Sequence, residues 1–117
     1  MATIDRQLWL NNLLEVARDI ADRDRQESRW TASDRFAWEK PEELINQLFD
    51  DCNFELFIEQ HSASMSAIQK EAAETLRHSI DKFCKDTPTH LVAKDVLADP
   101  RWHQIRKDAA VFVQEFA

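Results

Sequence analysis

The chain contains no glycine, and this absence constrains its fold more than any other feature of its 117 residues. Several phosphate-binding and catalytic sites need glycine, because only a residue without a side chain lets the backbone turn sharply or approach a ligand closely. The sequence therefore excludes the P-loop, the GxGxxG dinucleotide fingerprint, the glycine-rich kinase loop and the GxSxG nucleophile elbow. Tight β-hairpins also favour glycine, and no segment keeps a period-2 apolar pattern.

Apolar residues instead recur with the period of an α-helix. From Trp9 to Ala21 they occupy one half of a helical wheel, and Thr3 is a plausible N-cap. Residues 22–29 carry no apolar side chain, so they either extend this helix into solvent or form a loop. The tryptophans at 9 and 102 fall on core faces, and residues 30–40 read as a connection pinned to the core by its aromatic side chains, which are Trp30, Phe36 and Trp38.

Three further long segments show helical signals. Pro41 suits a first helical position, Ser62 or Ser64 is expected to cap a helix that runs to about Asp86, and Asp99-Pro100 reads as the start of a last helix. The apolar face of the third helix is expected to hold Met65, Ile68, Ala72, Leu76, Ser79, Ile80 and Phe83. A short helix from about His90 to Ala98, capped by Thr89, is also expected. The sequence thus predicts an all-α fold, a single domain over residues 1–117 that forms a bundle of four main helices plus one or two short ones.

The helix that begins at Pro41 changes phase near Asn53. If it continued unbroken, Phe54, Phe57 and Ile58 would point away from its first apolar face. Glu55 and Glu59 would then fall on the buried side, which is costly. We therefore expect a break at Asn53, because asparagine tolerates the left-handed backbone that glycine would otherwise supply.

The net charge of −7 is concentrated in the first half of the chain. Residues 1–60 hold seven Lys or Arg and 14 Asp or Glu, whereas the two signs balance over residues 61–117. Such a charge disfavours nucleic acid as a partner. No apolar run approaches a membrane span, and the start of the sequence shows no secretory signal, so we expect a cytoplasmic protein with Cys52 and Cys84 as free thiols.

The sequence contains few candidates for a catalytic or metal-binding site. HExxH and CxxC motifs are absent, and the helical spacings Glu74–His78 and Asp99–His103 are those of ordinary surface pairs. A local basic patch of Arg101, Arg106 and Lys107 is diluted by neighbouring acids and reads as a solvated helix face. We therefore expect no catalytic residue, metal or cofactor. A small metal-dependent enzyme stays open as an alternative, built from carboxylates and His61, His78, His90 or His103.

The most informative segment is 39–59, which holds seven acids, one lysine and several aromatic residues. Exposed aromatic side chains among carboxylates are typical of a surface that binds a basic protein. The expected protein-binding residues are Asp50, Asp51, Phe54, Glu55, Phe57 and Ile58. The alternative is that the three apolar residues of this set pack on another helix, with the acids merely solvated.

These features favour a non-enzymatic, acidic protein-binding module with a basic protein partner. In size, charge and fold class the chain is similar to bacterial immunity proteins, which neutralise basic nuclease toxins, although no motif carries this likeness. A self-associating helical adaptor or structural protein, and hence a homo-oligomer, is the second hypothesis. Salt separates the two, because binding through the acidic face should weaken with ionic strength and apolar self-association should not.

Overall fold

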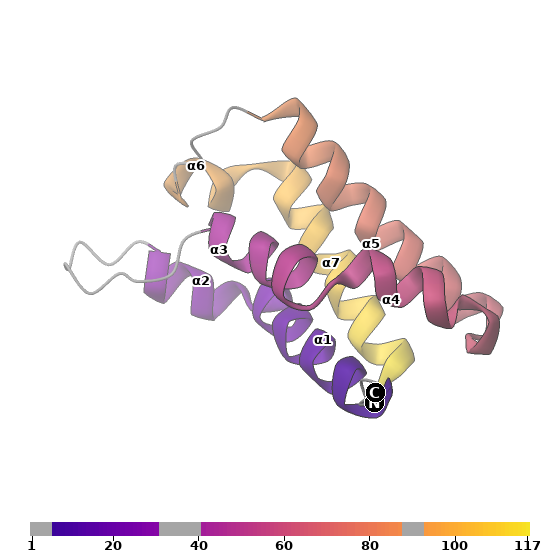
Figure 1. The fold of residues 1–117 in the computed structure, drawn as a ribbon. Helices are drawn as coiled ribbons and strands as arrows, with labels where there is room; N and C mark the ends of the chain where they lie inside the picture. The colour runs from indigo at the N-terminus through magenta and orange to yellow at the C-terminus, as the bar shows by residue number, and fades with distance from the viewer. Residues whose placement is uncertain (1–5, 31–40, 88–92) are drawn as a thin grey trace.

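The computed structural model describes residues 6–30, 41–87 and 93–117, and all regular structure in these ranges is helical (Figure 1). This confirms the all-α bundle. The elements are α1 (Arg6–Ala21), α2 (Arg23–Trp30), α3 (Pro41–Asn46), the π-helical turn η1 (Gln47–Asp51), α4 (Phe54–His61), the 3₁₀ turn η2 (Ser62–Ser64), α5 (Ala67–Asp86), α6 (Ala93–Ala98) and α7 (Pro100–Phe116).

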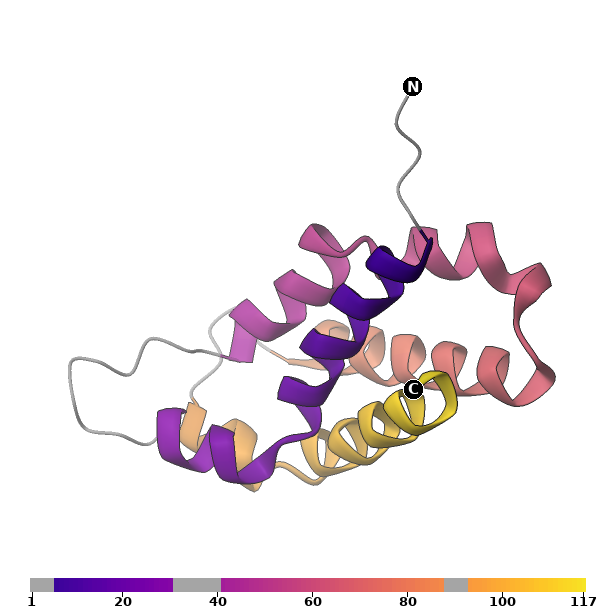
Figure 2. The same cartoon turned by 90° about the horizontal axis from the view of Figure 1, so that it is seen from below.

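Helix α7 is the centre of the bundle, because it packs along both α1 and α5. Figure 2 shows α5 and α7 side by side, and two long-range hydrogen bonds fix them as antiparallel. Gln69, near the start of α5, donates to the backbone oxygen of Glu115, near the end of α7. Ser79, further along α5, donates to Asp108, earlier in α7. The short elements α3, η1 and α4 cover the bundle from one side (Figure 1).

One cluster of buried apolar side chains joins these elements. It draws on helices from α1 to α7, including Trp9 and Trp102, which lie in the core as expected. Trp30 is also buried as expected, although it is the last residue of α2 rather than part of the connection that follows. The predicted roles of Phe36 and Trp38 fall outside the described residues, as do the expected caps Thr3 and Thr89 and the residue His90.

Helix α7 starts at the predicted residues, whereas α5 starts later than predicted. Asp99 caps α7 by accepting a hydrogen bond from the backbone N–H of Arg101. For α5 the cap is Ser66, which exchanges hydrogen bonds with Gln69 in a capping box. The expected caps Ser62 and Ser64 lie instead in the preceding 3₁₀ turn. Because α5 starts later than expected, Met65 precedes the helix. Ile68, expected on the apolar face, is exposed rather than buried.

The charged run after α1 is helical. A break at Asp22 separates α1 from α2, and Gln26 of α2 is completely buried although its neighbours are polar. Gln26 donates from Nε2 to the backbone oxygens of Ile20 and Asp19, at 2.6 and 3.0 Å. These carbonyls lie at the end of α1, where an α-helix leaves its last oxygens without intrahelical partners.

The break at Asn53 is confirmed. This residue takes a left-handed backbone, with φ 49° and ψ 54°, and it has the one positive φ among the residues that the structure describes. The helix that starts at Pro41 passes through the wider π turn and ends, and α4 begins at Phe54 with a new orientation. The second main helix of the prediction is thus a short α3 followed by η1, and α4 is the separate short element expected after the break.

Candidate protein-binding surface

The apolar side of α4 faces the core. Phe54, Phe57 and Ile58 are all buried, so the expectation that at least one of them is exposed in a binding surface is wrong. Phe54 lies edge-on to Phe49 and Phe112, with ring centroids 5.8 and 5.4 Å away. The turn at Asn53 causes this burial, because it rotates α4 relative to α3 and directs its apolar side toward the core.

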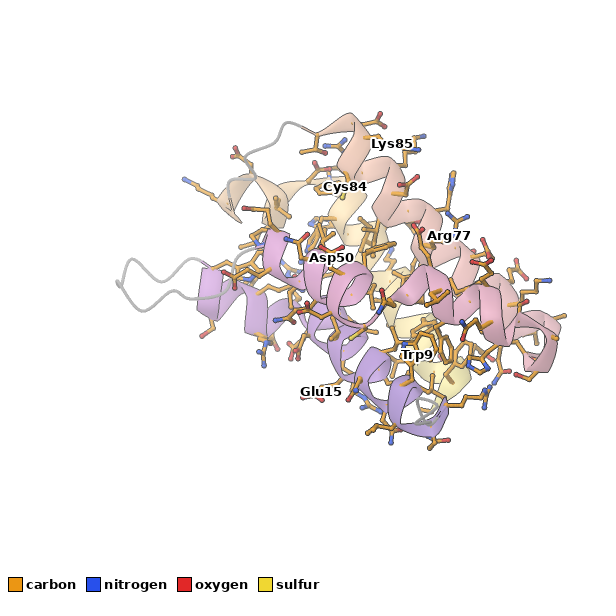
Figure 3. The ribbon with its side chains drawn as sticks, viewed as in Figure 1. Trp9, Glu15, Asp50, Arg77, Cys84 and Lys85 are labelled. Carbon is orange, nitrogen blue, oxygen red and sulfur yellow. The ribbon has the colours of Figure 1, made fainter. Side chains whose placement is uncertain are left out.

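Trp9 fixes the position of α4 against α1 (Figure 3). Its ring centroid lies 5.2 Å from that of Phe57 and 5.6 Å from that of His61, and both contacts are edge-on. The indole N–H of Trp9 also donates to the backbone oxygen of Cys52, just before the turn. Edge-to-face aromatic pairs add about 0.5–1.5 kcal/mol beyond the burial of their area. These contacts hold α4 against α1, and its outer side faces the solvent.

The acids of the expected site do lie on the surface. Asp50, Asp51 and Glu55 are exposed. Two of them help to line a hollow of about 440 Å³ between the π turn and the outer side of α4, here called the acidic hollow. Its lining consists of Phe49, Asp50, Asn53, Glu55, Leu56 and Glu59. Leu56 is 41% exposed and Phe49 is half-buried, so the hollow offers apolar area as well as charge.

The charges of the acidic hollow are all negative. Asp50, Glu55 and Glu59 line it, and neither a lysine nor an arginine does. Within the described ranges none of these three carboxylates forms an ion pair. Asp51 lies beside the hollow and, after burial, is the next cause that raises the pKa of the Cys52 thiol. A cation placed in the hollow would therefore meet three carboxylates, of which Glu55 also attracts Arg77 from the other side of α4.

A second hollow of about 420 Å³ lies on the other side of Glu55 and Glu59, between α4 and α5. Its charges are mixed, because Lys70 and Arg77 of α5 line it together with Glu74. Arg77 bonds Glu74 at 2.9 Å, and this hydrogen bond is the main cause that raises the pKa of the guanidinium. The charged residues that line the side of α4 facing η1 are thus all negative, whereas those on the side facing α5 are of both signs.

The sequence pairs considered as metal ligands have other partners. Glu74 bonds Arg77, and Asp99 bonds Arg101 at 2.6 Å. His103 lies with Nε2 2.8 Å from the backbone oxygen of Leu97. Across residues 6–30, 41–87 and 93–117, no three histidine, cysteine or acidic side chains are grouped so that they could hold a metal ion. In the same ranges no helix combines the length and apolar character that crossing a bilayer requires.

The two cysteines are free, and neither is a favoured nucleophile. Cys84 is exposed and Cys52 half-buried, yet burial is the largest cause of a raised pKa at both thiols. Acidic neighbours act in the same direction, namely Asp51 and Glu15 at Cys52 and Asp81 at Cys84. A raised pKa lowers the fraction of reactive thiolate at neutral pH.

The basic residues of α7 do not form a common patch. Arg106, expected on a solvated face, is buried, and loss of solvation lowers the pKa of its guanidinium. Arg101 bonds Asp99 and lies 4.9 Å from the ring centroid of Phe83. Lys107 is exposed, but neither Arg101 nor Arg106 adds a free cation beside it.

Sequence reasoning found the acidic part of the surface but missed its apolar part. It selected Phe54, Phe57 and Ile58, whereas Phe49 and Leu56 line the hollow. Glu59 also lines the hollow, although it is not among the expected site residues. Leu56 had a readable signal, because at 100° per residue it lies about 160° from Phe54 and on the other side of a helix that starts after Asn53.

Comparisons with known proteins give no match, whether with family models, with curated proteins or with solved structures. The function is therefore inferred from the surface itself.

Proposed function

We propose that this protein is a non-enzymatic binding module that docks a basic protein partner on the acidic hollow. The observation that supports it is the composition of that lining, in which three unpaired carboxylates surround two accessible apolar side chains, Phe49 and Leu56. Carboxylates bring a basic partner to the surface quickly and select against acidic ones, whereas apolar contacts at the centre supply most of the affinity.

The hollow fits a lysine or arginine side chain better than a flat apolar contact. The aliphatic stem of either side chain can pack on Leu56 and Phe49 while its charged end reaches the carboxylates. Arginine suits the site especially, because its planar guanidinium bonds carboxylates in a bidentate way. Since exposed charges are screened beyond about 8 Å at physiological salt, this binding is expected to weaken as salt rises.

We propose that the protein is an inhibitor of the immunity type and that its partner is a basic toxin such as a nuclease. A basic enzyme that binds nucleic acid presents cations at its own active surface, and an acidic module can occupy that surface. The cytoplasm is the proposed location, because a reducing compartment keeps Cys52 and Cys84 as thiols.

The test compares two variants with equal changes in net charge. The first, Asp50→Asn/Glu55→Gln/Glu59→Gln, neutralises the acidic hollow. The matched control, Glu43→Gln/Asp86→Asn/Asp95→Asn, neutralises three exposed carboxylates that line neither hollow. Each protein is used to capture partners from native lysate at low salt, and a captured protein is then purified and titrated by calorimetry.

We expect a basic protein that binds the wild type and the control alike, and that binds the hollow variant at least tenfold more weakly. Leu56→Ala should also weaken binding, whereas Leu8→Ala, which truncates an exposed leucine of α1, should not. Equal binding by the hollow variant and the control would overturn the proposal. Salt-insensitive self-association seen by light scattering, without any captured protein, would favour the adaptor alternative instead.

A further inference from the structure

A second surface, between α5 and α7, carries features of its own. A groove of about 170 Å³ there is lined by Ile68, Glu71, Ala72, Thr75, Asp108 and Val111. Ile68, Ala72 and Thr75 follow the i, i+4, i+7 spacing of one stripe along α5, and Asp108 and Val111 are three residues apart on α7. None of these six residues lines either of the hollows beside α4.

The groove holds two of the most exposed apolar side chains. Ile68 is 61% exposed and Val111 46%, and Ala72 between them is buried. A single exposed apolar residue is ordinary on a protein surface, whereas these two line one groove together with a buried alanine. Each side wall of the groove thus offers an apolar side chain to a molecule that lies along the seam.

Asp108 gives the groove its charge. It is only 8% exposed, and its carboxylate accepts hydrogen bonds from Ser79 Oγ at 2.6 Å and from Gln104 Nε2 at 3.0 Å. Both donors are neutral, and in the part of the chain that the structure describes no cation pairs with this carboxylate. Glu71 adds a second acid, and the lining contains no lysine or arginine. A charge held away from water without a cation favours a partner that supplies one.

We propose that the α5/α7 groove docks an amphipathic helix of a partner protein, with its apolar side chains on Ile68, Ala72 and Val111 and a lysine or arginine near Asp108 and Glu71. A helix laid in an apolar groove between two helices is a recurring mode of recognition, with anchors at i, i+3, i+4 and i+7. The charge complementarity selects a basic helix over an acidic one.

The same charges argue against a second copy of this chain as the occupant. A symmetric dimer through this groove would use the same surface on both subunits. Asp108 and Glu71 of one copy would then face the same acids of its partner, with no basic residue of the groove to offset them. A partner of different sequence avoids this repulsion.

The probe for this site is an 18-residue synthetic helix of leucine and lysine in an amphipathic pattern, with a leucine–glutamate peptide of the same pattern as its control. The host protein is the variant Asp50→Asn/Glu55→Gln/Glu59→Gln, so that the acidic hollow is neutral and failure of the groove is distinguished from failure of the proposed function. Binding is followed by amide chemical shifts in NMR and by fluorescence titration.

We expect shift changes concentrated along the facing sides of α5 and α7. The double variant Ile68→Ser/Val111→Ser should weaken the lysine peptide at least tenfold, and Glu71→Gln should weaken it a few-fold and reduce its dependence on salt. Leu8→Ser should leave its affinity within twofold, because that exposed leucine lies on α1 outside the groove.

Three results would overturn the proposal. The first is equal binding of the leucine–glutamate peptide, because the charge would then play no part. The second is an affinity that Leu8→Ser lowers as much as the groove variant does. The third is a dimer in sedimentation experiments that Ile68→Ser/Val111→Ser dissociates, because the occupant would then be a second copy of the chain.

Discussion

Trp102 of α7 donates its indole N–H to the side-chain oxygen of Gln26, 76 residues earlier in the chain, at 3.0 Å. The amide nitrogen of Gln26 at the same time bonds the last carbonyls of α1. One buried glutamine thus satisfies a tryptophan of the core and the open end of a helix. In many other proteins a left-handed glycine follows the helix, and backbone N–H groups then bond its last carbonyls.

Gln26→Ala should therefore be strongly destabilising. The substitution leaves the Trp102 N–H and the Ile20 carbonyl buried without partners, and each such group costs about 1–3 kcal/mol. We expect the free energy of unfolding in urea to fall by about 2–4 kcal/mol. Gln114→Ala, at an exposed glutamine of α7, should change it by less than about 0.5 kcal/mol. Similar small losses for both variants would show that the buried amide contributes little.

Asn53 should tolerate glycine better than alanine. A left-handed backbone costs a residue with a β-carbon about 1–2 kcal/mol, and asparagine and glycine bear that cost most easily. We expect Asn53→Ala to lower the melting temperature by several degrees and Asn53→Gly to leave it nearly unchanged. Differential scanning calorimetry measures both. A drop of equal size in the two variants would mean that the asparagine side chain, and not the backbone, matters there.

Phe57 and Leu56 are adjacent in sequence, but truncation of Phe57 should reduce stability and truncation of Leu56 should reduce binding. Phe57 is completely buried against Trp9, so Phe57→Ala should cost about 3–5 kcal/mol of unfolding free energy. Leu56 lies at the edge of the acidic hollow, so Leu56→Ala should cost less than about 0.5 kcal/mol and act on binding instead. Equilibrium unfolding separates the two effects. A stable Phe57→Ala variant would contradict the packing described for α4.

The Asp99 cap of α7 should make the free energy of unfolding depend on pH in the acid range. The hydrogen bond from the Arg101 side chain holds the pKa of Asp99 below its usual value of 3.8. Because the carboxylate is favoured in the folded state, its stabilisation is present above the unfolded pKa and is lost as pH falls through the lower folded pKa. Asp99→Asn should thus be less stable than wild type at pH 6, and the gap should close below about pH 4. Urea titrations from pH 6 to pH 2 measure it, with Asp95→Asn as control. A gap that does not change with pH would argue that Asp99 acts only as a neutral cap.

The sequence predicted elements whose signals are local. The phase change at Asn53 and the Asp99-Pro100 start were readable from a few neighbouring residues, and both were found in the structure. The signal for the cap at Ser66 is equally local, because Gln69 completes a capping box, but the prediction places the cap at Ser62 or Ser64.

The remaining errors concern contacts between distant segments. Gln26 stands in a charged run and shows no local sign of burial, since its partner Trp102 lies on another helix. The side of α4 that faces the solvent depends likewise on Trp9, which closes over Phe57 from α1. Periodicity identifies the apolar side of a helix, but it does not identify what packs against that side.

The Gln26 contact also determines how the junction between α1 and α2 opens. Asp19 and Ile20 at the end of α1 accept hydrogen bonds from Gln26 of α2, which itself accepts one from Trp102 of α7, so we expect fraying of this end to break a core contact. In native-state hydrogen exchange, helix ends usually exchange through small local openings. The backbone amides near this junction should instead exchange as slowly as the centre of α7, through an opening that involves the whole bundle.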